Sequence, residues 1–183
     1  MRFLGRWLGQ SLTLAAGILA LALAAQAPGF AEHYMAALEQ RAQEQRADIA
    51  GRVIVVRRIY GLPESADAHA VLLYLTEREP ANAASLRQSA QRLAALEAAY
   101  GRLTAASPLL RPLLAVPALT IGNGAVADVA DSALATYTPR LPLSLPALVY
   151  GIAGLFLGVL LAEALASLAR APFRRAAPPP RPW

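Results

Sequence analysis

The sequence contains little charge and no cysteine or lysine. Only 16% of its 183 residues are charged and 56% are hydrophobic, whereas a soluble domain usually has about 25% charged residues. The absence of cysteine excludes disulfides, a thiolate zinc site and a thiol nucleophile. His33 and His69 are too few and too far apart for a histidine-built metal site. A protein folded in water is therefore not expected.

The basic charge is concentrated at the two ends of the chain. All 17 basic residues are arginine, against 12 acids, yet the stretch from Glu32 to Asp131 holds 10 arginines and 11 acids. Nucleic-acid binding would require a basic patch on a folded face. The surplus of arginine lies instead in the two tails, where it indicates how the chain is oriented in a membrane. No nucleic-acid partner is expected. The tail arginines are Arg2, Arg6, Arg170, Arg174, Arg175 and Arg181.

Two apolar runs predict membrane-spanning helices. Trp7 to Ala25 is free of charge, and Leu141 to Leu168 holds one charge, Glu163; about 20 apolar residues cross a hydrocarbon core of ~30 Å. The alternative for the first run is a cleaved signal, with Ala25-Gln26-Ala27 as its site. The length of the apolar run, and Pro28 directly after Ala27, favour an uncleaved anchor over a cleaved signal.

The arginine tails place both termini in the cytoplasm under the positive-inside rule, and the middle outside it, which in a bacterium means the periplasm. The expected location is the bacterial inner membrane. The predicted segments are a tail over 1–6, spans over 7–27 and 141–169, a helical periplasmic segment over 28–140 and a tail over 170–183.

The middle of the chain reads as helices. Apolar residues recurring from Phe30 to Tyr60 predict one amphipathic helix of about 30 residues. Ser65 or Asp67 is expected to cap a shorter helix that breaks at Glu79-Pro80, and Asn82 to cap the next one. That helix carries a heptad seam made of Leu86, Ser89, Leu93, Leu96, Tyr100 and Leu103.

The seam is too short to favour a coiled-coil dimer over an intramolecular helix contact. Pro108, Pro112 and Pro117 exclude one continuous helix beyond it, and the leucines among them predict a segment on the membrane surface or under the helices. A last helix is expected from Val126 to Tyr137. The predicted fold class is an all-α membrane protein whose two transmembrane helices are joined by a helical, antiparallel, coiled-coil-like periplasmic segment.

Both apolar runs carry small residues at helical spacing. Such stripes allow helix backbones to approach closely in lipid. They predict packing of the two spans on each other; a homodimer or docking on a larger membrane complex is the alternative. The helix-packing residues are Ala16, Ala20, Ala24, Ala147, Gly151, Gly154, Gly158 and Ala162, with Ala166 continuing the second stripe.

Glu163 is the single charge within either run. An ionised acid there is costly unless it reaches the interface or meets a cation. In an antiparallel pair Arg6 lies at the same depth and Gln10 one turn deeper. Glu163 is predicted to pair with Arg6 or to hydrogen-bond Gln10, and the competing possibility is a solvated acid near Arg170.

The junctions between the runs and the middle hold prolines, a glycine and aromatic residues. Each junction can redirect the chain, because proline fixes φ and glycine admits conformations that others avoid. The aromatic rings are expected at headgroup level as anchors. These junction residues are Pro28, Gly29, Phe30, Tyr34, Tyr137, Pro139 and Pro142.

These junctions resemble a known family. Residues 26–30 followed by Tyr34 are similar to its Q-x-P-G-F…Y element, and residues 138–143 followed by Gly151, Gly154 and Gly158 to its T-P-x-x-P-L…G…G element. The family is the two-span proteobacterial membrane family catalogued as domain of unknown function 2937. The resemblance implies an inner-membrane protein with a helical periplasmic part and supplies no activity.

No catalytic constellation is evident. Gly122-Asn123-Gly124 lacks the preceding strand of a phosphate-binding loop and is interpreted as a turn. No cofactor, metal or enzymatic activity is expected. The sequence favours a non-catalytic accessory or scaffold protein whose partners are the lipid bilayer and other membrane or periplasmic proteins, with a homo-oligomer left open. The alternative is a small transporter or channel component.

Overall fold

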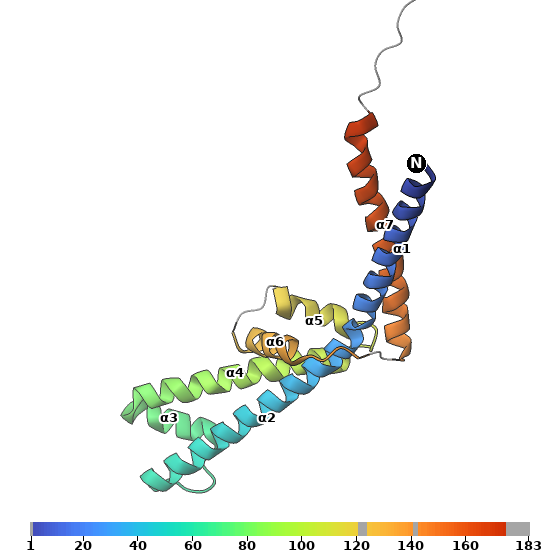
Figure 1. The fold of residues 1–183 in the computed structure, drawn as a ribbon. Coiled ribbons are helices and arrows are strands. Elements are labelled where there is room, and N and C mark those ends of the chain that lie inside the picture. Colours follow the sequence, from blue (N-terminus) through green and yellow to red (C-terminus); the bar gives the residue numbers. More distant parts are fainter. Residues whose placement is uncertain (1, 121–123, 141–142, 175–183) are drawn as a thin grey trace, which may run out of the picture. The chain divides into compact units, whose positions relative to one another are not determined.

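The computed structural model describes residues 2–120, 124–140 and 143–174, and every regular element in these ranges is an α-helix. The chain divides into two compact units, one made of 1–29 with 139–183 and the other of 30–138. The all-helical class predicted from the sequence is confirmed. The helices are α1 (Arg2–Ala25), α2 (Ala27–Tyr60), α3 (Ala68–Arg78), α4 (Pro80–Ala105), α5 (Arg111–Thr120), α6 (Ala125–Thr136) and α7 (Leu145–Arg174) (Figure 1).

The first unit is built from α1 and α7, which pack side by side (Figure 1). At 1.5 Å per residue their 24 and 30 residues extend about 36 and 45 Å, enough for a ~30 Å hydrocarbon core. Large apolar side chains cover their outer faces: Leu12 is 74% exposed, Leu23 66% and Phe156 65%. Such faces are unfavourable in water and suit lipid, and the two candidate spans predicted from the sequence are confirmed by length and composition.

The second unit is organised around the antiparallel pair α2 and α4 (Figure 1). One cluster of buried side chains joins the start of α2 to the end of α4, α5 and α6, with Tyr34 and Leu38 at its centre. A second cluster joins the end of α2 to α3 and the start of α4, with Val71 and Leu75 fully buried. An exposed ion pair between Arg46 and Glu97 bridges the two helices at the surface.

The heptad seam of α4 faces its own chain in this unit. Leu86, Leu96 and Leu103 are buried in the two clusters that α2 helps to form. The seam is therefore used in helix contacts within one molecule.

The helix ends of the second unit agree with the sequence at most positions. α2 ends at Tyr60 before Gly61, whose φ of 64° lies in the left-handed region, and the carboxylate of Asp67 accepts a hydrogen bond from the Ala70 N–H at 2.8 Å. The prediction for Asn82 is wrong. α4 begins at Pro80, because proline is favoured in a first helical turn, and the Asn82 amide donates instead to Glu79 at 2.8 Å.

α5 and α6 follow α4 after a short turn. α5 contains Pro117 within its helical range, and Gly124, with a φ of 69°, precedes α6. The two helices are bent by 107° and together are long and apolar enough to form one broken span. The predicted turn at 122–124 lies partly outside the described residues.

Candidate functional site

The tightest contact in the first unit is between small residues of α1 and α7. A Cβ atom added at Gly154 would lie 2.5 Å from the Ala24 Cβ and 2.6 Å from the Ala20 carbonyl oxygen. One added at Gly158 would lie 2.5 Å from the Ala20 Cβ and 3.0 Å from the Ala16 carbonyl oxygen. The two backbones therefore approach so closely that only glycine fits at these positions.

The remaining small residues lie around this contact with more room. A Cβ at Gly151 would be 3.5 Å from the Ala25 Cβ, which is an ordinary van der Waals separation. Ala147 is buried and Ala162 is half-buried. The contact pairs run in opposite directions along the two helices, so α1 and α7 are antiparallel.

Sequence reasoning missed Gly17 as part of this contact. A Cβ at Gly17 would lie 2.8 Å from the Val159 Cγ2 atom. Its spacing of three from Ala20 was the available signal.

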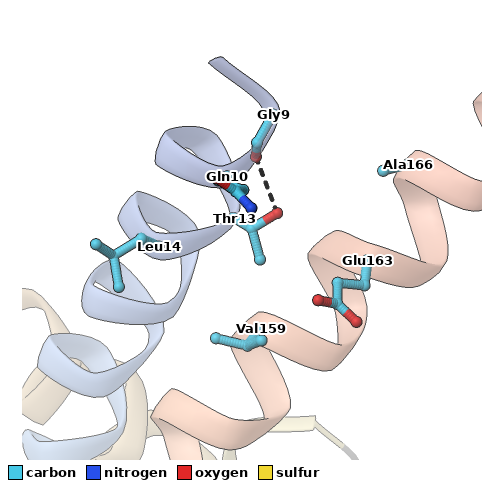
Figure 2. A pocket seen from close by; sticks show the side chains of 7 residues that line it. All are labelled: Gly9, Gln10, Thr13, Leu14, Val159, Glu163 and Ala166. Carbon is cyan, nitrogen blue, oxygen red and sulfur yellow. Dashed lines mark hydrogen bonds between the residues drawn. The ribbon is translucent and has the colours of Figure 1, made fainter. Parts of the chain in front are cut away.

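A polar groove of about 540 Å³ lies between α1 and α7 on the side of the N-terminal turns of α1. Figure 2 shows Gln10 and Thr13 of α1 across from Glu163 of α7. The Thr13 hydroxyl donates to the Gly9 carbonyl oxygen at 3.1 Å, and Gln10 and Glu163 bring an amide and a carboxylate to the groove. Apolar walls are completed by Leu14, Val159 and Ala166.

The groove brings Glu163 and Gln10 together without joining them. Both side chains are exposed, and within the described ranges no hydrogen bond links them. Arg6 belongs to α1, but its side chain lies outside the described residues, as do the side chains beyond Leu168. The pair of Glu163 with Arg6 therefore stays a prediction.

The junction after the first span differs from the prediction. Only Gln26, in a turn, separates α1 from α2, and both Pro28 and Gly29 lie within the first turn of α2. Among the described glycines, positive φ occurs at Gly61 and Gly124, so Gly29 does not redirect the chain through a special conformation. Proline fits here because the first helical N–H groups have no partner in the helix.

The second junction is tied to the first by one hydrogen bond. The Gln26 side-chain oxygen accepts from the backbone N–H of Arg140 at 3.1 Å. Pro139 lies in the extended segment before α7, and Leu141 and Pro142 lie outside the described residues. The predicted role of Pro142 is therefore untested.

Aromatic rings gather at one end of the second unit. The rings of Phe30 and Tyr34 stack with centroids 6.2 Å apart, and Tyr137 meets Phe30 edge-on at 5.7 Å. The prediction that Tyr34 lies at headgroup level as an anchor is wrong. Its side chain is only 2% exposed and lies in the core. Phe30 and Tyr137 are half-buried against it.

The burial of Tyr34 leads us to expect that the folded protein loses stability at high pH. Burial raises the pKa of its hydroxyl above the usual 10.0, and the nearby Arg102 lowers it less. The folded protein then holds this proton more tightly than the unfolded chain, so stability present below pH 10 is lost as the pH rises through the folded pKa. Tyr34→Phe should reduce this alkaline loss in thermal unfolding measured from about pH 9 to 11. An unchanged pH dependence would contradict the assignment.

The far end of α2 displays apolar side chains to solvent. Ile54 is 51% exposed, Val55 53% and Ile59 67%, whereas Val53 and Val56 on the inner side are buried. We call Ile54, Val55 and Ile59 the α2 patch. A groove of about 490 Å³ adjoins it, lined by Asp48, Gly51, Arg52, Val55, Val56, Leu75, Asn82 and Leu86.

Metal-ligating side chains are not gathered anywhere in the described ranges, residues 2–120, 124–140 and 143–174. In these ranges no three His, Cys, Asp or Glu residues lie close enough to hold a metal ion. The structure offers a tight contact between α1 and α7, a groove beside Glu163 and the α2 patch. They define an all-helical protein with two helices suited to span a membrane.

The comparison with protein families identifies the chain more closely. Residues 8–175 match the family described as "Protein of unknown function (DUF2937)", and the chain belongs to this family. No match was found among curated proteins or among solved structures.

Proposed function

We propose that the protein is a non-catalytic scaffold of a bacterial inner membrane that binds another membrane or periplasmic protein. The α2 patch is the observation that carries this proposal. Exposed isoleucine and valine beside a groove are unfavourable in water, and such surfaces commonly mark protein interaction sites. Buried side chains of α2, α3 and α4 form one cluster beneath the patch, so the patch is presented on a packed element.

The membrane arrangement is part of this proposal. We place both termini in the cytoplasm and residues 30–138 in the periplasm, because six arginines lie in the tails outside the spans and the middle is nearly neutral. An accessory role fits this arrangement, because the two spans would anchor the domain that carries the α2 patch to the inner membrane.

Site-specific photo-cross-linking tests the partner. A photoreactive amino acid at Ile54 or Ile59 is expected to yield a discrete cross-linked product in cells, identified by mass spectrometry. Gln43, an exposed polar residue on the same helix, is the matched control and should give none. Equal products at Gln43 and at the α2 patch would contradict the proposal.

Cysteine labelling tests the topology. The chain has no cysteine, so Gln88→Cys on the exposed side of α4 supplies a single thiol. A membrane-impermeant maleimide should label this thiol in intact spheroplasts. A cytoplasmic tag at either terminus should require lysis for detection. Labelling of the thiol only after lysis would overturn the proposed orientation.

A transporter component is the second candidate, and the polar groove is the observation that favours it. An acid with polar neighbours inside a membrane commonly marks an ion or solute path. If the groove conducts, purified protein in liposomes should produce proton flux that Glu163→Gln reduces by roughly tenfold or more. Flux equal to that of empty liposomes would reject this candidate.

A further inference from the structure

The outer face of α5 and of the turn before it carries large apolar side chains. Pro112 and Ala115 point inward and are buried. The residues turned outward are large and about half exposed: Leu110 52%, Leu113 59% and Val116 50%. Leu109 and Leu114 extend the same surface. We call these five outward residues the α5 face.

Charge is absent from this part of the chain. From 112 to 127 the sequence holds no charged residue. Arg111 begins α5, but its Nε–H is directed at the end of α4, toward the carbonyl oxygens of Leu103 and Ala106, each at 3.2 Å. The α5 face thus offers water no ionic group over its whole length, unlike the usual solvent side of a surface helix.

One cation lies at the edge of the face. Arg102 lines a hollow of about 420 Å³ together with Tyr34, Leu114 and Pro117. An arginine beside exposed leucines is the pattern of a helix lying in a membrane interface, where the guanidinium meets phosphate and the leucines enter the acyl region.

Chain length restricts how far α5 can be from the end of the first span. Tyr34, which lines the same hollow as α5 residues, follows Ala25 by nine residues, and seven of these steps are helical. Two extended steps and seven helical ones cover less than about 20 Å. Only a short length of chain therefore separates the end of the first span from Tyr34, which lines the hollow beside α5.

We propose that the α5 face lies in the headgroup and acyl boundary of the same bilayer that α1 and α7 span. This inference rests on the proposed membrane location of those two helices. The occupant is lipid, because the face is uncharged, Arg102 at its edge can pair with a lipid phosphate, and the chain is anchored by α1 and α7.

Spin-label accessibility tests the proposal in the full chain. Single cysteines at Leu110, Leu113, Ile54 and Ile18 would carry a nitroxide in vesicles of phosphatidylethanolamine and phosphatidylglycerol. Ile54 is the matched control, since it is as exposed as Leu110 and apolar but belongs to the α2 patch. Ile18, on the outer side of α1, reports whether the span itself is inserted.

Labels on the α5 face should show a several-fold higher ratio of oxygen to nickel-chelate accessibility than the label at position 54. If position 18 is lipid-exposed but both α5 positions favour the nickel chelate, the inference fails while the membrane location stands. If position 18 also favours the nickel chelate, the membrane location itself fails. Spin–spin broadening at position 113 would show a second copy on this face and would equally overturn the proposal.

Discussion

Replacing Gly154 and Gly158 together with alanine is expected to separate α1 from α7. Each added Cβ would be 2.5 Å from an alanine Cβ of α1, and each also meets backbone atoms that cannot move aside alone. The helices must then move apart by roughly 1 Å, and overpacking of this kind costs about 1–3 kcal/mol at each site. Because lipid provides no hydrophobic drive for helix association, close packing is the main contribution to their contact, and its loss is not offset.

The separation can be followed with nitroxides at Ser11 and Ser167, which are exposed on the two helices. The wild-type protein should give one narrow distance distribution in mild detergent, and the double variant a broad one. Gly151→Ala is the matched control, since the same methyl group on the same helix would meet its nearest atom at 3.5 Å. A broad distribution for Gly151→Ala, or a narrow one for the double variant, would contradict the packing described.

The second large effect is expected in the core of the unit formed by residues 30–138. Leu75 is 2% exposed in the cluster shared by α2, α3 and α4. Leu75→Ala should lower the free energy of unfolding by about 2–5 kcal/mol, because it removes buried methyl groups and leaves a cavity. Thermal unfolding followed by circular dichroism should show the midpoint lowered by about 10 °C or more.

Leu73 provides the control on the same helix. It is 58% exposed, so Leu73→Ala should change the stability by less than about 0.5 kcal/mol. Equal losses at the two positions would show that α3 does not pack in the orientation described.

Periodicity was sufficient to predict most of the helices. The long amphipathic stretch through Tyr60, the break at Glu79-Pro80 and the cap at Asp67 each rest on local rules, and the structure follows them. Asn82 shows the limit of such rules. Asparagine and proline both mark helix starts, and the choice between them depended on Pro80 fitting the first turn.

Other features depended on three-dimensional contacts that spacing alone does not give. Tyr34 looked like an interfacial anchor because it follows a span closely, but α4, α5 and α6 bury it. The α2 patch was equally hidden in the sequence. Val53, Ile54, Val55 and Val56 form one apolar run, and only the packing of α3 and α4 shows which two of them face outward.

Disulfide cross-linking is the most direct test of the packing of α1 on α7. In an Ala25→Cys, Gly151→Cys variant the two Cβ atoms should be about 3.5 Å apart, within the range of disulfide geometry, in a chain with no other cysteine. Mild oxidation in membranes should protect both thiols from maleimide labelling in a monomeric species. Pairing Ala25→Cys with Ile152→Cys, on the exposed side of α7, should leave both thiols free. Free thiols in the first variant, or cross-linking only between two chains, would contradict the packing of α1 on α7 within one molecule.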